Sequence, residues 1–240
     1  MVLINSLAPR KQKRVAIVQS NYIPWKGYFD LIAAVDEFIF YDDRQYTRGD
    51  WRNRNQIKTP QGVQWLTVPV KKKGNYHQEI RHIAIEGTDW INHHLEFLRR
   101  TYGRAPFLKE VMSFLEPIYK ECHPTLSDLN HALIHVICQY LNIPTRFTCS
   151  WDYVAEGEKT ERLIDLCRQA GATEYLSGPL AKNYLDAQGF NAENIQLTWF
   201  HYEGYPSYPQ LWGDFVHEVS ILDLLFNCGK EASRYMRYVG

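Results

Sequence analysis

The stretch VAIVQSNYIPWKGYFDLIAAVDEFIFYDD, residues 15–43, decides the fold class. Residues 15–18 are apolar and mainly β-branched, which is typical of a buried strand. A polar loop separates them from a helical pattern over residues 27–35, and residues 37–41 form a second apolar run. Strand, loop, helix and strand in this order are the opening unit of a parallel α/β sheet.

A polar cluster follows the first strand, at the carboxyl end where parallel sheets bind their ligands. Its candidate binding residues are Gln19, Asn21, Tyr22 and Lys26. Free N–H groups and the dipole at the start of the next helix favour a phosphate or carboxylate there. An ordinary polar connection between strand and helix is the alternative.

Two adjacent carboxylates, Asp42 and Asp43, end the second strand. Adjacent residues of a strand point to opposite faces, so we expect one of the two to enter the cleft. There a carboxylate can bind a metal ion, orient a substrate amine or act as a base, and we expect Asp43 to position or deprotonate the amine. Solvated turn residues are the alternative.

The segment WRNRN, residues 51–55, is the densest polar cluster of the chain. Arg52 and Arg54 carry the planar fork that binds phosphate or carboxylate, and we expect them to neutralise charge that develops during group transfer. Trp51, Asn53 and Asn55 are candidate substrate contacts. A salt-bridged surface loop is the alternative.

The remaining chain predicts more strands around a helical middle. Apolar runs on both sides of a turn at residues 60–62 predict an antiparallel hairpin, and residues 80–85 alternate like a further strand. Residues 71–76 are polar and predict an exposed, mobile loop. Helical spacing predicts helices over residues 89–102, from 106 onward, 127–141, 160–170 and 180–187. The expected fold class is therefore α/β, with a mainly parallel Rossmann-like sheet, a small antiparallel insertion and a helical section.

A second strand-to-helix connection offers another anion site. Ser177 and Gly178 follow a short predicted strand, and glycine allows close approach of a ligand to the backbone. Lys159, at the start of the preceding predicted helix, is long enough to reach a phosphate. A helix cap with a solvated first turn is the alternative for Lys159. The histidines show no metal-ligand spacing, and His131 and His135 are interpreted as structural or solvent-facing residues.

Length and composition limit the class of protein. The 240 residues suffice for a single domain over residues 15–240, which we expect to follow a flexible extension over residues 1–14. Lys plus Arg and Asp plus Glu both number 27, a balance that argues against a dedicated nucleic-acid binder. Five widely spaced cysteines without a CxxC pattern, and the lack of a long apolar run, predict a cytoplasmic protein with reduced thiols and no membrane insertion.

Several long strings resemble one protein family. VQSNYIPWKGYFDLI, FIFYDD, WRNRNQI, EKTERLIDLC, YLSGPLAKNYL and SILDLLFN resemble the WbqC-like protein family over nearly the whole chain. That family is known mainly from bacterial O-antigen and other surface-polysaccharide gene clusters. The resemblance implies a transferase or ligase that attaches an amino acid, for example glycine, or a related acyl group to an activated sugar.

A more distant resemblance concerns the start of the first helix. PWKGYFDLI, residues 24–32, is similar to the HIGH-motif loop of nucleotidyltransferases and pantoate–β-alanine ligases. Neither histidine of that motif is present, because Trp25 or Lys26 stands near the first position and Tyr28 at the second. Lys26 can supply positive charge and the Tyr28 hydroxyl a hydrogen-bond donor.

Two classes of function follow from these features. The first is an aminoacyl or acyl transferase, or an ATP-dependent amide ligase using ATP and Mg²⁺, in O-antigen or surface-polysaccharide biosynthesis. The second is a non-catalytic protein that binds a nucleotide-sugar or a protein partner on a nucleotidyltransferase-like scaffold. A weaker third hypothesis is an RNA-binding module using Trp51, the flanking arginines and the lysines at residues 71–73. The sequence specifies no oligomeric state.

Overall fold

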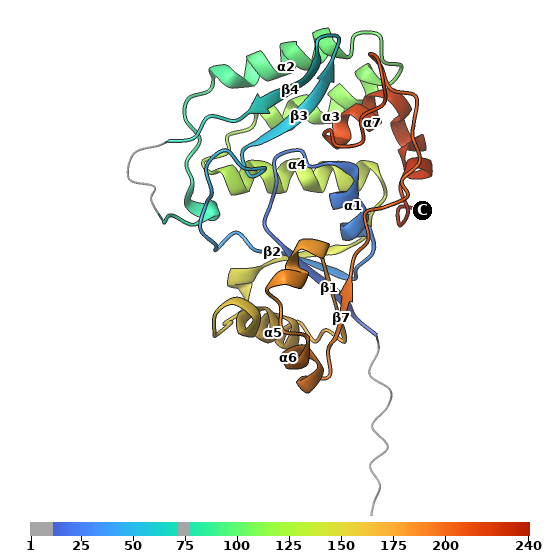
Figure 1. The fold of residues 1–240 in the computed structure, drawn as a ribbon. Coiled ribbons are helices and arrows are strands. Elements are labelled where there is room, and N and C mark those ends of the chain that lie inside the picture. The colour runs from blue at the N-terminus through green and yellow to red at the C-terminus, as the bar shows by residue number, and fades with distance from the viewer. Residues whose placement is uncertain (1–11, 72–76) are drawn as a thin grey trace, which may run out of the picture.

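A five-stranded parallel sheet lies at the centre of the protein. The computed structural model describes residues 12–71 and 77–240 (Figure 1). The strands are β1 (Arg14–Val18), β2 (Glu37–Phe40), β5 (Arg146–Cys149), β6 (Glu174–Ser177) and β7 (Gln196–Trp199). Their order across the sheet is β5-β2-β1-β6-β7, with all neighbours parallel. The α/β prediction with a Rossmann-like sheet is confirmed.

Helices cover both faces of this sheet. Helices α1 (Lys26–Ala33) and α4 (Leu126–Tyr140) lie on one side, and α5 (Lys159–Gln169) and α6 (Ala187–Ala192) on the other (Figure 1). Alternate strand residues therefore enter two separate cores, which explains the nearly continuous apolar runs of β1 and β2. Ala16, Phe38 and Phe40 enter the core on the α1 and α4 side, and Val15, Ile17 and Ile39 the other core.

The segment between β2 and β5 forms the insertion that the sequence predicts. Strands β3 (Arg54–Thr59) and β4 (Gly62–Thr67) pair in an antiparallel hairpin. Helices α2 (Asp89–Thr101) and α3 (Leu108–Lys120) follow before α4. With α7 (Ile221–Cys228), these elements form the upper part of the molecule in Figure 1. None of the helices in residues 12–71 and 77–240 has the length and hydrophobicity that a bilayer crossing requires.

Two predicted elements are wrong. Residues 80–85 are not a strand; Ile80–His82 form a short 3-10 helix, followed by isolated bridges at Ala84 and Ile85. The reason is that Ile80 and Arg81 donate their backbone N–H groups to carbonyls of the loop after β2, which turns the chain. The helix predicted over residues 180–187 is instead a 3-10 helix, Pro179–Asn183, and then α6, whose first turn is capped by Asp186.

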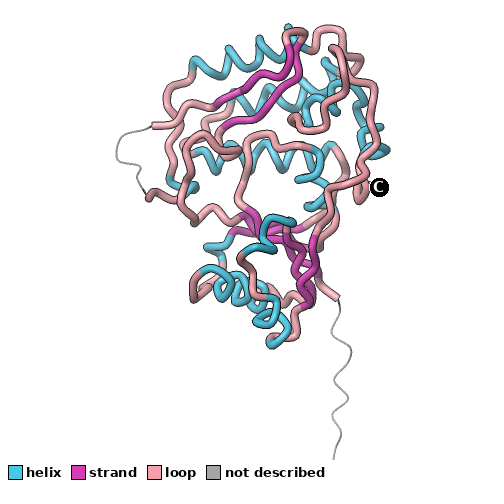
Figure 2. Tube along the Cα trace, viewed as in Figure 1, coloured by secondary structure: helices cyan, strands magenta, loops and turns pink. Residues whose placement is uncertain are grey.

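The two ends of the described chain are held by the sheet and by α1. Lys13, inside the predicted extension, forms an ion pair of 2.6 Å with Glu37, while residues 1–11 and most of the loop predicted at 71–76 lie outside the described residues. A long irregular segment joins β7 to α7 (Figure 2). Near the carboxyl terminus, the buried Asp30 carboxylate of α1 accepts hydrogen bonds from the backbone N–H groups of Arg237 and Tyr238, at 2.8–3.0 Å.

Candidate functional site

The strand order reverses between β1 and β6, and this is where open α/β sheets form a ligand-binding crevice. The loop after β1 begins at Gln19, Ser177 ends β6, and Gly178 follows it. Gly178 has an ordinary φ of −65°, and a Cβ built on it would meet only the Tyr202 hydroxyl, at 3.8 Å. The backbone at Gly178 is therefore open to close approach by a ligand.

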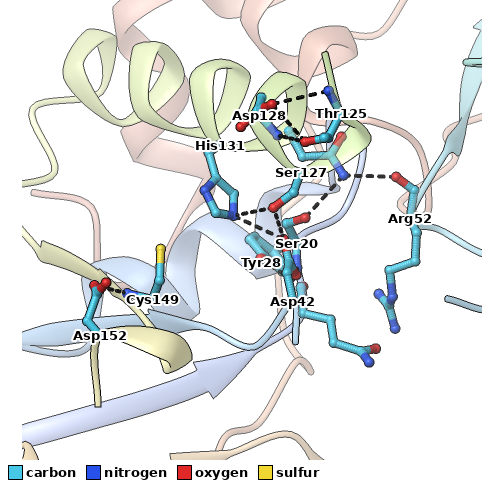
Figure 3. A network of polar contacts seen from close by, with 12 residues as sticks. Ser20, Tyr28, Asp42, Arg52, Thr125, Ser127, Asp128, His131, Cys149 and Asp152 are labelled. Carbon is cyan, nitrogen blue, oxygen red and sulfur yellow. Dashed lines mark hydrogen bonds and ion pairs between the residues drawn. The ribbon is translucent and has the colours of Figure 1, made fainter. Parts of the chain in front are cut away.

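A buried carboxylate organises the neighbouring edge of the sheet. Asp42 is fully buried, and its Oδ1 accepts a hydrogen bond of 2.7 Å from the backbone N–H of Ser20 (Figure 3). Its Oδ2 accepts from the Ser127 hydroxyl at 2.6 Å and lies 3.0 Å from His131 Nε2. Burial alone would raise the pKa of Asp42, but His131, Ser127 and the Ser20 N–H bring it below its ordinary value. The carboxylate is therefore ionised at neutral pH.

His131 is a site residue that the sequence interpretation missed. An ionised carboxylate only accepts, so the His131 nitrogen that faces Asp42, Nε2, carries a proton, and Nδ1 is the acceptor in the neutral ring. The ring stacks on Phe40 at a centroid distance of 3.7 Å and lies parallel to Trp151 at 6.3 Å. Trp151 is 37% exposed, so this histidine borders the surface. Nothing in the spacing of His131 reveals a partner 89 positions away.

Asn130 and Tyr28 hold the loops of this edge together. Asn130 Nδ2 donates to the Ser20 hydroxyl at 3.2 Å and to the Arg52 carbonyl at 2.9 Å. The Tyr28 hydroxyl donates to the Gln19 carbonyl at 3.1 Å, and burial, with the nearby Asp42 charge, raises the pKa of Tyr28 well above its ordinary value. A phenol has one proton to donate, so Tyr28 supports the loop after β1.

Asp43 points toward α5, on the face of the sheet opposite to α4, which Asp42 contacts; strand alternation predicts this. Arg162, in α5, donates to its Oδ2 at 2.6 Å, and Arg44 Nε lies 3.3 Å from its Oδ1. Burial raises the pKa of Asp43, but Ser150, Arg44 and Arg162 bring it below its ordinary value. Both oxygens of each carboxylate thus have protein partners, an arrangement that does not fit a Mg²⁺ site. No group of three possible metal ligands occurs in the described part of the chain.

The WRNRN segment sends its side chains to different places. Arg52 donates to the Asn21 side chain and lies 3.6 Å from the Asp50 carboxylate, beside the loop after β1. Asn55 is buried and donates to the Tyr22 and Ile23 carbonyls, both at 3.0 Å. Trp51 is exposed and packs against Trp65, while Asn53 and Arg54 line a cavity beside the hairpin. Of the predicted cluster, Arg52 and Asn55 contact the loop after β1 through their side chains.

Two predicted binding residues lie in the protein interior. Tyr22 is fully buried, with its hydroxyl against His94 Nδ1 at 2.9 Å and against the Tyr119 hydroxyl. Lys26 is 2% exposed and donates to the Pro206 carbonyl at 3.1 Å. A further predicted binding residue, Lys159, lies outside the interior: it is exposed at the start of α5, with a φ of +47°.

A cavity of about 520 Å³ opens at the opposite, amino edge of the sheet, lined by residues such as Arg14, Asp36 and Thr145. Its volume exceeds that of the hairpin cavity, but its Asp36 carboxylate is bound to the backbone N–H of Arg14 at 2.7 Å. Ligands of open α/β sheets bind at the carboxyl edge, so we place the candidate site there.

Comparison with known proteins gives a family match over most of the chain. The model of the WbqC-like protein family matches residues 19–235. The chain is also similar to a protein of Mycobacterium tuberculosis (strain ATCC 25618 / H37Rv) called "Uncharacterized protein Rv1507c". The two are 59% identical over 227 residues, which cover 94% of this chain and 98% of the relative. No solved structure gives a significant match.

Proposed function

The chain belongs to the WbqC-like protein family, and we propose that it is a transferase or ligase acting on an activated sugar. The group that it transfers is an amino acid, for example glycine, or a related acyl group. The product belongs to the biosynthesis of O-antigen or another surface polysaccharide. ATP or an acyl donor supplies the activation.

The observation that carries this proposal is the reversal of strand order between β1 and β6. It puts β1 and β6 side by side, so that their carboxyl ends meet at the edge where open α/β sheets bind nucleotides, and the backbone of Gly178 follows β6 there. In the proposal Gln19, Asn21 and Ser177 contact the phosphates of a nucleotide or nucleotide-sugar. Arg52, next to Asn21, neutralises their charge.

The acceptor amine or hydroxyl is assigned to the edge formed by Asp42 and Asp43. Asp43, held by Arg162 and Arg44, orients the acceptor, because each carboxylate oxygen can accept a second hydrogen bond. No step is routed through a metal ion, since the two guanidinium groups beside Asp43 repel a cation. Lys26 and Arg54 take no part in this proposal, since Lys26 is buried against Pro206 and Arg54 lines the hairpin cavity.

The first test is titration calorimetry of the purified protein with UDP-glucose and with ATP, on the wild type and on Gly178→Ala. The methyl group of the variant would occupy the space beside the Tyr202 hydroxyl, so we expect nucleotide affinity to fall by at least about tenfold. The φ of −65° suits alanine, so the unliganded thermal midpoint serves as the control and should stay or rise. Equal affinity of the two proteins would contradict nucleotide binding at Gly178.

A second candidate function is a non-catalytic protein that binds a nucleotide-sugar. It is favoured by the two residues near the HIGH positions, because the Tyr28 hydroxyl is bound to the Gln19 carbonyl and Lys26 is buried. Neither is then available to a phosphate during adenylyl transfer. A pyrophosphate-release assay with ATP, UDP-glucose and each amino acid separates the two: binding without turnover supports this alternative.

A further inference from the structure

A cavity of about 350 Å³ lies beside the hairpin, between the loop that follows β2 and the segment that follows β4. Pockets for small molecules begin at about 300 Å³, so it is large enough for a ligand the size of a monosaccharide. It shares no lining residue with the Asp42 network or with Ser177 and Gly178. The lining residues used below are Tyr46, Arg48, Asn53, Arg54, Lys71 and Glu86.

Asn53 is a buried member of this wall, 7% exposed. Its Nδ2 donates to the Val68 carbonyl at 2.9 Å, and its backbone carbonyl accepts from the Val68 N–H at 2.8 Å. These bonds fix the amide, and its other atom, Oδ1, has no hydrogen-bond partner among the described residues. Buried side-chain acceptors without a hydrogen-bond partner are uncommon and destabilise the folded protein. A ligand group that donates a hydrogen bond to Asn53 Oδ1 would remove this cost.

Arg54 is held in place beside Asn53. Its guanidinium lies over the Trp65 ring, 4.1 Å from the centroid. On another side the chain approaches closely at Gly49, where φ is +66° and a Cβ would lie 3.6 Å from an Arg54 Nη. Arg54 Nε is buried and also lacks a hydrogen-bond partner among the described residues. The edge formed by Nε and one Nη is the donor pair that binds a carboxylate or phosphate in bidentate fashion.

The charge and polarity of the wall define the ligand. Three cationic side chains, Arg48, Arg54 and Lys71, line the cavity together with one carboxylate, Glu86. The Arg54 edge without a hydrogen-bond partner among the described residues favours an anion, whereas Asn53 Oδ1 and Glu86 accept hydrogen bonds and so favour hydroxyl groups. The apolar residues 68–70 offer contact to ring carbons.

We propose that this cavity binds a small polyhydroxylated anion, a sugar phosphate or a sugar carboxylate. The acidic group lies on Arg54, and a hydroxyl donates to Asn53 Oδ1. The proposal is independent of the nucleotide site at Gly178.

The test uses four probes: glucose 6-phosphate, glucuronate, glucose and inorganic phosphate. Together they separate recognition of the acidic group from recognition of the sugar hydroxyls. Titration calorimetry on the full chain compares the wild type with Arg54→Met, which removes the fork but keeps an unbranched chain over Trp65. Arg54→Lys keeps the positive charge, loses the fork and serves if the first variant does not fold. Arg234→Met is the matched control, because the Arg234 side chain is 75% exposed and pairs with the nearby Glu231.

We expect glucose 6-phosphate or glucuronate to bind at least about tenfold more tightly than glucose or phosphate, and whichever binds more tightly identifies the acidic group. Both Arg54 variants should lose about tenfold or more of this affinity, whereas Arg234→Met should keep it. The proposal is overturned if neither sugar acid binds with a Kd below roughly 10 mM, if phosphate alone binds equally well, or if the Arg54 variants bind as the wild type does.

Discussion

The replacement Lys26→Met tests whether this lysine belongs to the interior or to an anion site. The Lys26 ammonium lies 5.0 Å from the centroid of the Tyr205 ring and 5.1 Å from that of Tyr208, and it donates to the Pro206 carbonyl. At 2% exposure it has little water around it. Burial lowers the pKa of Lys26 to about 8, although the Asp30 charge acts in the opposite direction.

The size of the effect follows from this change in pKa. The step from the ordinary value of 10.5 to about 8 corresponds to about 3 kcal/mol, at roughly 1.4 kcal/mol for each tenfold change in proton affinity. Below pH 8 both the folded and unfolded chains carry the proton, and the cost of burying the charge is fully present. Between pH 8 and pH 10.5 the unfolded chain binds a proton that the folded chain has lost, so the free energy of unfolding rises with pH.

The assay is urea denaturation of the wild type and Lys26→Met at intervals from pH 7 to pH 10.5. Tyrosines also titrate in this range, but they do so in both proteins, so the difference between the two isolates Lys26. The wild type should gain about 3 kcal/mol relative to the variant across the range, and a variant of the exposed Lys230, Lys230→Met, should show no such change. A constant difference would refute the reasoning and return Lys26 to the list of candidate anion ligands.

Three further outcomes are expected. Gly27→Ala should lower the free energy of unfolding by about 2 kcal/mol, because the added Cβ would lie 2.3 Å from the Trp25 ring. Thermal denaturation measures this, and an unchanged melting temperature would show that the ring moves aside freely. Asp42→Asn should lower the free energy of unfolding by about 3 kcal/mol in urea at pH 7, since it leaves His131 without its anionic partner. The variant should also lack part of the stability that the wild type loses as pH falls below about 4, because the pKa of Asp42 is lowered in the folded protein. Equal acid sensitivity of the two proteins would show that Asp42 is not held ionised by this network. A thiol reagent should modify the exposed Cys122 rapidly in the folded protein and the buried Cys138, Cys167 and Cys228 only on unfolding. Cys149 is partly exposed, but burial raises the pKa of its thiol to about 12, so it should react more slowly than Cys122; fast modification of a buried thiol would argue against this burial.

Local patterns in the sequence predict most of the architecture. The apolar runs of β1 and β2, the turn of the hairpin and the helical spacing of α4 are signals within about 15 residues, and all of these elements form. The strand predicted over residues 80–85 failed because its apparent alternation was overridden by contacts to the loop after β2.

The site is less accessible to sequence reasoning because its contacts are distant along the chain. Positions directly after strands single out the loop after β1 and the Ser177–Gly178 segment, and β1 and β6 are neighbours in the sheet. That these segments bind a ligand stays a prediction. The environment of Lys26 comes from residues about 180 positions later, and no local pattern indicates that it is buried. For the same reason the partnership of His131 with Asp42 was missed.

The hydrogen bonds that the backbone of Arg237 and Tyr238 donates to the Asp30 carboxylate affect the order of folding. These hydrogen bonds join residues 207 and 208 positions apart, and β1 likewise acquires its second neighbour, β6, only after about 160 more residues have been made. During synthesis the first strand and helix therefore leave the ribosome long before the groups that bury them. Contacts of such wide separation slow folding. We expect the amino-terminal unit, although translated first, to be among the last parts of the chain to reach its final packing.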